Sequence, residues 1–287
     1  NLRTLTYKDY IHKDEFIESI KTNNIPYKVD AIVHMGACSS TTEMDSDYLM
    51  ENNYRYTRTL AEWALSHNIR FIYASSAATY GDGALGFNDD HDQLHQLQPI
   101  NRYGYSKHLF DCIALDNDWL DSLVGLKFFN VFGPNEYHKE SMRSVVCKSY
   151  QQVLDQKEIK LFKSHHPDYA DGGQMRDFVY VKDCVKIIDW LIDTPSVAGI
   201  YNIGTGVSQT WNDLATAVFK AMDIPTNITY FDMPESIRGQ YQYYTEAKID
   251  KLREAGYKAP MTPLEEAVAD YISGYLSQDS TLGCILR

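Results

Sequence analysis

Short apolar runs alternate with longer amphipathic stretches along most of this chain. The run Val29–Gly36 is apolar and ends in small residues, which is typical of a strand buried on both faces of a parallel sheet. Similar runs occupy Arg70–Ser75, Val124–Phe129 and Gly199–Ile203. Strands that alternate with helices form a parallel sheet covered on both faces. The pattern therefore predicts an α/β fold with a doubly wound parallel sheet.

Amphipathic stretches between these runs predict the helices. Residues Asp45–Ser66 repeat apolar positions at helical spacing, and further helices are expected to begin at Tyr103 and Ser141. The buried stripe of the first of these helices would consist of Leu49, Asn53, Tyr56, Leu60 and Trp63.

The carboxy-terminal part is less regular. Two capping boxes are expected, Thr210 with Asp213 and Thr262 with Glu265, each before a helix, with a strand near Ile228–Phe231 between them. The final helix would bury Leu264, Val268, Tyr271, Ile272 and Tyr275. We predict a dinucleotide-binding domain over residues 1–140, to which segments near 176–206 return, and a smaller, mainly substrate-binding lobe over 141–287.

Composition and charge narrow the function. The chain has 287 residues, is 44% hydrophobic and carries a formal net charge of −12, which argues against non-specific nucleic-acid binding. There is no apolar run long enough to span a bilayer and no signal-peptide pattern at the start of the sequence, so we expect a cytoplasmic protein. The five cysteines are scattered and odd in number, which favours free thiols in a reducing compartment, with neither disulfides nor zinc.

The glycines Gly81, Gly83 and Gly86 fit the Gly-x-Gly-x-x-Gly pattern, but an acidic segment follows them instead of a helix. The pattern binds a pyrophosphate only where it joins a strand to a helix, so we expect an ordinary flexible loop here. The turn Gly204-Thr205-Gly206 is expected to join a strand to a helix. We further expect that a first strand, its glycine turn, a first helix and a second strand precede Asn1.

Tyr103-Gly104-Tyr105-Ser106-Lys107 carries candidate chemistry. In a helix, Tyr103 and Lys107 share one face, and an ammonium beside a phenol would lower the phenol pKa from about 10. Alone this motif is weak, because a chain with 22 Tyr contains one such pair by chance. Other polar residues follow strand ends, where ligands bind in such sheets: Gly36 to Ser39, Ser75-Ser76 and Asn130.

Taken together, these motifs resemble the extended short-chain dehydrogenase/reductase superfamily, whose fold is Rossmann-like. The resemblance rests on Tyr103-x-x-x-Lys107, Asn130 to Pro134, Arg176 to Val181 and Asn202 to Gly206. Within the superfamily the chain is similar to the ADP-L-glycero-D-manno-heptose 6-epimerases, through Gly36 to Glu43, Tyr73 to Gly81, His138-Lys139 and Ser141-Met142. A dehydratase would carry an Asp-Glu pair after the catalytic Ser/Thr, whereas this chain has Ala77-Ala78. The chain departs from the family at Lys127, Asn135 and Lys148, where arginine, arginine and histidine are usual, and these departures bear on phosphate and sugar contacts.

The resemblance implies an NADP-dependent isomerase that inverts C6″ of ADP-D-glycero-D-manno-heptose by oxidation and return of hydride, in lipopolysaccharide core precursor synthesis. It implies catalytic roles for Ser76, Tyr103 and Lys107, and a second acid/base role for Lys139. Cofactor contacts would come from Met35, Gly36, Ala37, Cys38, Ser39, Asn52, Lys107, Val131 and Lys139. Substrate contacts would come from Asn130, Ser141, Lys148, Phe162, Lys163, Ser164, His165, Arg176 and Tyr241. A homopentamer is also implied, and a metal site is not.

Several alternatives stay open on the residues alone. The chain could act as another nucleotide-sugar epimerase, such as a UDP-glucose 4-epimerase, or bind a nucleotide sugar without catalysis. Ser76 could be satisfied by backbone groups, and Lys139 could be a solvated loop charge. Asn52 could be a solvated helix residue and Met35 a core residue. Arg176 could pair with Asp177 or Asp183.

Overall fold

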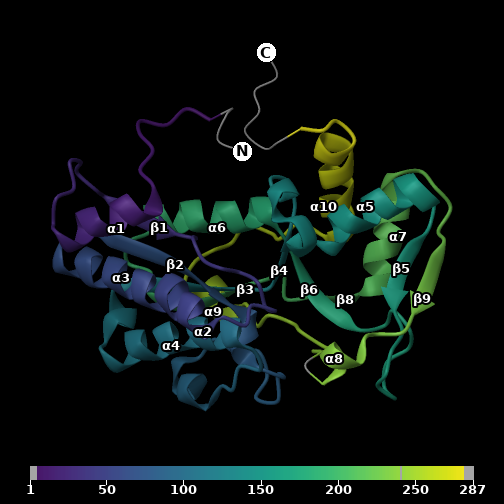
Figure 1. Cartoon of the computed structure of the whole chain (residues 1–287), viewed down its shortest axis with the longest axis horizontal. Coiled ribbons are helices and arrows are strands. Elements are labelled where there is room, and N and C mark those ends of the chain that lie inside the picture. The colour runs from purple at the N-terminus through teal and green to yellow at the C-terminus, as the bar shows by residue number, and fades with distance from the viewer. Residues whose placement is uncertain (1–4, 240, 281–287) are drawn as a thin grey trace.

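The computed structural model describes residues 5–239 and 241–280, and its centre is a four-stranded parallel sheet (Figure 1). The strand order is β1 (Ala31–His34), β2 (Arg70–Ser76), β3 (Leu123–Phe128) and β7 (Gly199–Ile203). Each neighbouring pair is parallel. All four predicted strands are therefore present, the first shorter than expected and the last with the predicted bounds.

Helices cover both faces of this sheet. Successive strand residues point to opposite faces, so Tyr73 packs in a core with α3 (Tyr56–Ser66) and α4 (Arg102–Asp116). Its neighbour Ile72 packs on the other side in a core that includes α6 (Val181–Asp193). In Figure 1, α6 lies above the sheet and α3 and α4 lie below it. The predicted doubly wound α/β class is confirmed.

A second group of elements lies beside the main sheet. It contains a three-stranded sheet and a two-stranded sheet, which share a hydrophobic core with three helices. The sheets are β4 (Asn130–Phe132), β6 (Met175–Tyr180) and β8 (Ser208–Thr210), and β5 (Ile159–Phe162) with β9 (Ile228–Phe231); the helices are α5 (Val145–Gln156), α7 (Trp211–Ala221) and α10 (Leu264–Tyr271). The boundary between a dinucleotide domain and a substrate lobe stays a prediction.

Shorter elements complete the part of the chain that the structure describes. The helix predicted over Asp45–Ser66 is continuous, but its middle widens into a π-helix at Met50–Arg55. The 3₁₀ helix η3 (Ala77–Tyr80) follows β2 directly. The remaining helices are α1 (Lys13–Lys21), α2 (Ser46–Leu49), α8 (Glu235–Arg238), α9 (Asp250–Glu254), the 3₁₀ helices η4 (His91–Gln96), η5 (Trp119–Asp121) and η6 (Tyr137–Met142), and a π-helix at Ile272–Leu276.

Two local predictions need correction. The helix expected from Ser141 begins at Val145, because Glu140 has a non-helical backbone (φ 47°) and the segment before it forms η6. The capping box at Thr210 is confirmed, whereas the one at Thr262 is wrong, because α10 has no side-chain cap and follows Pro263. The Thr262 backbone N–H instead donates to Asp183 Oδ2 at 2.7 Å.

The two glycine segments also differ from each other. Gly81, Gly83 and Gly86 all have positive φ and lie in turns after η3, which confirms a loop instead of a strand-to-helix junction. The turn Gly204-Thr205-Gly206 leads first into the short strand β8, and α7 follows that strand. The sequence did not predict β8.

Candidate active site

Helix α4 begins beside the carboxyl end of β2. Asn101 caps it by accepting a hydrogen bond from the Gly104 backbone N–H at 2.7 Å. A Cβ built at Gly104 would lie 2.7 Å from the Ala78 carbonyl oxygen, so this glycine lets α4 pack directly on η3. The close approach brings Tyr103 against the turn that carries Ser76.

Ser76, Tyr103 and Lys107 come together as the sequence predicts. Ser76 Oγ accepts the Ala78 backbone N–H at 3.1 Å as the N-cap of η3, and a side-chain hydrogen bond links Ser76 with Tyr103. Lys107 Nζ donates to the Ala74 carbonyl oxygen in β2 at 2.9 Å. Ser76 is partly buried, while Tyr103 and Lys107 are only 9% and 4% exposed. The backbone contact of Ser76 therefore coexists with its contact to the phenol.

The charges of this triad differ from the sequence prediction. Burial raises the pKa of Tyr103, and the hydrogen bond from Ser76 only partly offsets that shift. Burial lowers the pKa of Lys107 to about 8, against the pull of the Asp111 charge. The expectation that Lys107 depresses the Tyr103 pKa is therefore wrong for this structure. The physical reason is that both groups lose water and that the ammonium hydrogen-bonds backbone in β2.

A cavity of about 320 Å³ opens beside the triad. Ser76 lines it from the end of β2, Asn130 from β4 and Arg176 from β6. Tyr241 lines it from the loop that also carries Tyr243 and Tyr244, the tyrosine-rich loop. These four residues were predicted to meet. Other residues that line it are Thr41, Ala77, Ala78, Ile100, Asn101, Phe128, Phe129, Gln242 and Thr245.

Arg176 is the cationic residue of this cavity. It is 7% exposed, its guanidinium lies 5.7 Å from the Trp211 ring and 5.0 Å from the Tyr241 ring, and its Nη1 donates to the Met175 carbonyl oxygen at 2.8 Å. Burial lowers its pKa. The alternative that it pairs with a neighbouring carboxylate finds no support, because Asp177 and Asp183 accept hydrogen bonds from other residues. Its remaining N–H groups suit an anionic ligand group in the cavity.

The loop after β1 is held by a residue that the sequence analysis placed only in the helix stripe. Asn53 accepts the Cys38 backbone N–H at 2.8 Å and donates to the Cys38 carbonyl oxygen at 3.0 Å. It also donates to Ser106 Oγ on α4 at 3.0 Å. Asn53 is 1% exposed, whereas its predicted neighbour Asn52 is partly buried and contacts Asn53. A buried amide within an otherwise apolar stripe was the available signal.

Other predicted cofactor residues directly follow β1 or lie within β4. Met35 is 37% exposed and Val131 is 36% exposed, so neither is an ordinary core residue. Gly36, Ala37, Cys38 and Ser39 form the loop that Asn53 holds. These apolar and backbone groups lie on the same edge of the sheet as Lys107.

Several predicted site residues lie apart from the cavity. Lys139 and Ser141 are exposed on η6, and Lys148 is exposed on α5. None of the three lines the cavity beside Ser76 in the part of the chain that the structure describes. Their functional roles stay predictions.

The segment Phe162 to His165 lies against the tyrosine-rich loop. The Phe162 ring lies 6.3 Å from the Tyr241 ring, and the His165 backbone N–H donates to Tyr243 Oη at 3.3 Å. Lys163 pairs with Asp232 at 3.4 Å, and the Ser164 backbone N–H donates to Asp171 Oδ1 at 2.7 Å. Through Tyr241, this segment borders the predicted substrate region.

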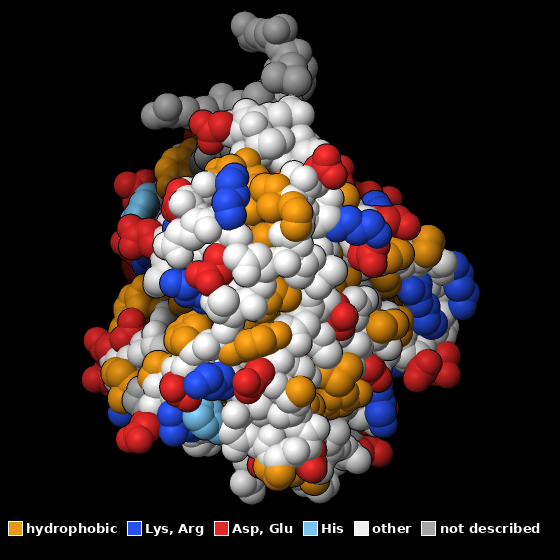
Figure 2. Space-filling view, turned by 90° about the vertical axis from the view of Figure 1, so that its right-hand side faces the viewer, with side chains coloured by type: hydrophobic (Ala, Val, Ile, Leu, Met, Phe, Trp, Pro, Cys, Tyr) orange, Lys and Arg blue, Asp and Glu red, His pale blue; other side chains and the backbone are white. Residues whose placement is uncertain are grey.

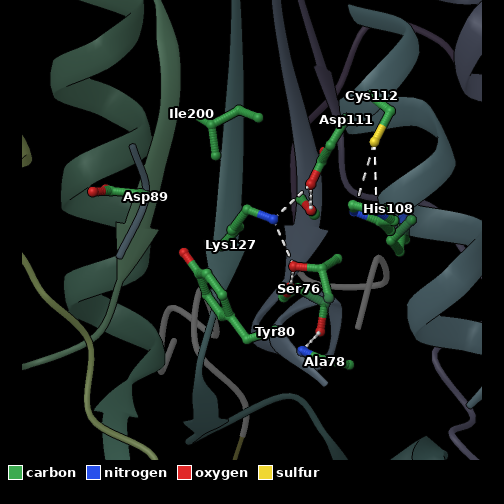
Figure 3. Close-up of polar contacts among 12 residues, drawn as sticks. Ser76, Ala78, Tyr80, Asp89, His108, Asp111, Cys112, Lys127 and Ile200 are labelled. Carbon is green, nitrogen blue, oxygen red and sulfur yellow. Dashed lines mark hydrogen bonds and ion pairs between the residues drawn. The ribbon is translucent and has the colours of Figure 1, made fainter. Parts of the chain in front are cut away.

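Lys127 lies away from the cavity, although it stands close to the Asn130 motif in the sequence. We expected this departure to bear on phosphate and sugar contacts, yet its side chain is fully buried and pairs with Asp111 (Figure 3). This corrects the sequence interpretation, because Lys127 shares its face of β3 with Leu123 and Gly125, which face α4 and not the cavity. Asp111 was not singled out from the sequence.

Over residues 5–239 and 241–280 no cluster of three or more His, Cys, Asp or Glu residues could hold a metal ion. No helix in that same part is long and apolar enough to cross a membrane. Cys38, Cys112, Cys147 and Cys184 are free thiols, and Cys284 lies outside the described residues.

The doubly wound sheet and the Ser76, Tyr103 and Lys107 triad at its carboxyl edge define a class of enzymes that work on a bound nucleotide sugar with a dinucleotide. Residues 3–204 match the model of the NAD dependent epimerase/dehydratase family, and the chain belongs to that family. It is similar to the ADP-L-glycero-D-manno-heptose-6-epimerase of Nitratidesulfovibrio vulgaris strain DP4, with 56% identity over 277 residues, 96% of this chain and 86% of the relative. The protein of that name from Fusobacterium nucleatum is 46% identical over 98% of this chain and 87% of its own length. The crystal structure of the Helicobacter pylori ADP-L-glycero-D-manno-heptose-6-epimerase matches with a TM-score of 0.75 and 28% identity, over 92% of this chain and 77% of that one. The resemblance inferred from the motifs is thereby confirmed.

Proposed function

We propose that this chain is an isomerase that converts ADP-D-glycero-D-manno-heptose to ADP-L-glycero-D-manno-heptose with bound NADP. The observation that carries the proposal is the triad of Ser76, Tyr103 and Lys107 beside a cavity whose cationic residue is Arg176. The relatives' names supply the sugar nucleotide. The product would then enter the synthesis of the lipopolysaccharide core.

The described residues fit the nicotinamide end of a dinucleotide. Lys107 would hold its ribose, the loop held by Asn53 would contact it, and exposed Met35 and Val131 would offer apolar surface. When bound, the dinucleotide supplies reversible oxidation of the carbon that carries the reacting hydroxyl. The choice of NADP over NAD follows the resemblance of the chain to the heptose epimerases.

Proton movement falls to the chain's own side chains. Ser76 would hydrogen-bond the reacting hydroxyl and Tyr103 would take its proton as that carbon becomes a ketone. Because burial raises the Tyr103 pKa, the phenol is protonated at neutral pH, and substrate binding must favour the phenolate.

Inversion requires the ketone to present its other face before the bond to hydrogen forms again. A second proton group then serves the other orientation, and we propose Lys139 for that role. Lys139 is exposed on η6, beyond the end of β4. From this position a lysine side chain would have to turn toward the cavity when substrate is bound.

Substrate recognition would use the groups around Arg176. Its buried guanidinium suits bidentate contact with a phosphate, and the rings of Trp211 and Tyr241 lie 5.7 Å and 5.0 Å from it. Asn130 would contact the sugar, and the segment Phe162 to His165 would border the nucleotide. Ser141 and Lys148 would add contacts from η6 and α5.

The experiment separates this function from its alternatives. The protein is incubated with ADP-D-glycero-D-manno-heptose and, separately, with UDP-galactose, each with NADP and with NAD, and the epimers are separated by chromatography. Preferential turnover of the heptose supports the proposal. Preferential turnover of UDP-galactose would favour a 4-epimerase, and binding without turnover of either would favour a non-catalytic protein.

Two further parts of the proposal concern the whole molecule. We infer a homopentamer from the resemblance, which sedimentation equilibrium would test directly. Free thiols at four described cysteines support a reducing, cytoplasmic compartment.

A further inference from the structure

A buried ion pair between Lys127 and Asp111 lies close to the turn that carries Ser76 (Figure 3). Lys127 Nζ and Asp111 Oδ2 are 2.8 Å apart, and both side chains are 0% exposed. Among the described residues that line the active-site cavity, neither appears. Burying two charges is unfavourable unless hydrogen bonds satisfy them fully. The remaining partners of this pair are therefore informative.

Lys127 reaches the turn that carries Ser76. Its Nζ donates to Thr79 Oγ1 at 2.5 Å, and Thr79 Oγ1 donates in turn to the Ser76 carbonyl oxygen at 2.8 Å. The same ammonium lies 4.9 Å from the centre of the Tyr80 ring. The Lys127 ammonium thus contacts Thr79 and Tyr80, two of the four residues of η3. Through Thr79 it is also linked to Ser76, the N-cap of η3.

Asp111 gathers the other side of the network. Its Oδ1 accepts Tyr73 Oη at 2.9 Å, and its Oδ2 accepts Ser75 Oγ at 2.7 Å as well as Lys127. A Cβ at Gly125 would lie 2.5 Å from Tyr73 Oη, so this glycine makes room for the phenol. The Asp111 carboxylate on α4 therefore accepts three hydrogen bonds, two from β2 and one from β3.

Asp111 also stands one helical turn after Lys107. Burial lowers the pKa of Lys107 to about 8, and the Asp111 charge opposes that shift. Without the carboxylate, Lys107 would lose its proton at a lower pH.

We propose that Asp111 and Lys127 are positioning residues of the active site: Lys127 holds the Ser76 turn through Thr79, and Asp111, one helical turn after Lys107, holds Lys127 and Ser75 in place. Neither residue contacts the reacting atoms. The expected effect on catalysis rests on the proposed function, whereas the positions of the Ser76 turn and of Asp111, and the charge of Lys107, do not.

Among the titratable groups described around Lys107, Asp111 is the carboxylate whose charge acts on the Lys107 ammonium. Burial and the nearby Lys107 charge lower the pKa of His34 on β1 to about 3, so His34 is neutral. The groups that feel Asp111 or contact it are Tyr103, His108 and Cys112 on α4, Tyr73 on β2, Tyr80 on η3, His91 on η4 and Lys127 on β3.

The first test measures Lys107 without substrate or cofactor. Lysine labelled with ¹³C at Cε is titrated by NMR, and the Lys107 signal is assigned by its loss in Lys107→Arg. We expect a midpoint near pH 8 in the unaltered protein and a fall of at least about half a pH unit in the double variant Asp111→Asn, Lys127→Met. Because both buried charges leave together, the double variant should fold. Asp111→Asn alone predicts the same direction and replaces the double variant if it does not fold.

The second test separates the Thr79 link by a matched pair of variants. Thr79→Val keeps the side-chain shape and removes the hydroxyl, whereas Thr79→Ser keeps the hydroxyl. In Thr79→Val the Ala78 amide, which donates to Ser76, should exchange with solvent at least about tenfold faster, and kcat for epimerisation should fall about tenfold. Thr79→Ser should behave as the unaltered protein, and the Lys107 midpoint should stay constant in both.

Two results would overturn the inference. One is a Lys107 midpoint that stays in place when Asp111 loses its charge, and the other is an Ala78 amide that exchanges equally in Thr79→Val and Thr79→Ser. A protein that does not turn over the heptose would count against the proposed function alone, because the NMR and exchange results need no substrate.

Discussion

Gly104 offers a sharp test of how the active site is assembled. A Cβ at this position would lie 2.7 Å from the Ala78 carbonyl oxygen and 3.2 Å from Pro99 Cβ, whereas ordinary contacts begin at 3.4 Å. In Gly104→Ala a shift of 0.7 Å, the difference between 3.4 and 2.7 Å, in backbone that follows Ser76 would restore an ordinary contact. A backbone carbonyl in η3 cannot rotate away as a flexible side chain would.

The expected effect follows from two opposing terms. Alanine in a helix is more favourable than glycine by about 1 kcal/mol, while overpacking of this kind costs about 1–3 kcal/mol. The net loss of stability should therefore be small, at most about 2 kcal/mol. Activity should suffer more, because a displacement approaching 1 Å between Ser76 and Tyr103 lowers kcat by about ten- to a hundredfold.

The assay compares kcat for epimerisation and the free energy of unfolding in urea for Gly104→Ala and a control. Gly274→Ala suits the control, since its nearest contact for a Cβ is Asp270 Oδ1 at 3.7 Å and it also lies in a helix. The control should keep full activity. A Gly104→Ala protein with normal kcat would refute the argument that the close approach of α4 to η3 sets the site.

Three further predictions concern individual side chains. Tyr103→Phe and Lys139→Met should each lower the rate of epimerisation at least about a hundredfold without loss of the fold. The double variant should be only slightly slower than either single variant, because both residues would act in one cycle. Normal turnover by Lys139→Met would show that Lys139 is a solvated loop residue. Arg176→Lys should raise KM for the sugar nucleotide at least about tenfold, because a lysine cannot make the bidentate contact; an unchanged KM in steady-state kinetics would contradict the phosphate role. Burial, with a smaller effect of the Lys107 charge, lowers the pKa of His34 to about 3. Below the unfolded pKa of about 6.5 the unfolded chain therefore binds a proton that the folded chain does not, and the free energy of unfolding decreases as the pH is lowered. Between pH 7 and pH 5 this one group should cost about 2 kcal/mol, and urea titrations of His34→Gln should show a smaller loss over that range.

The fold was predictable because its signals are local. Apolar runs such as Gly199–Ile203 can be buried on both faces only inside a covered sheet, and the spacing of Tyr103 and Lys107 places them on one helix face whatever surrounds them. The capping box of Thr210 and Asp213 involves four consecutive residues, so the sequence contains all of it.

The space-filling view illustrates what such local signals leave out. In Figure 2 hydrophobic and charged side chains are interspersed over the face shown, which gives no indication of the buried network behind the site. That network joins Lys127 on β3 to Asp111 on α4, 16 positions apart in the chain. Asp111 does not look unusual in sequence, since charged residues occur on most helices, and Lys127 stands out only as a lysine where arginine is usual.

Tertiary structure alone decided the remaining features of the site. The partners of Arg176 are rings from α7 and the tyrosine-rich loop instead of the adjacent carboxylates, because β6 directs its side chain into the cavity and Asp177 to the opposite face. The loop at Cys38 is held by Asn53 and not by Asn52, a choice set by which residue of the helix faces inward. The pKa shifts of Tyr103 and Lys107 follow from burial. Sequence thus determined the strands, the helices and the spacing of the reactive pair, whereas loss of water and contacts between distant segments, which exist only once the chain has folded, determined its charges and its support.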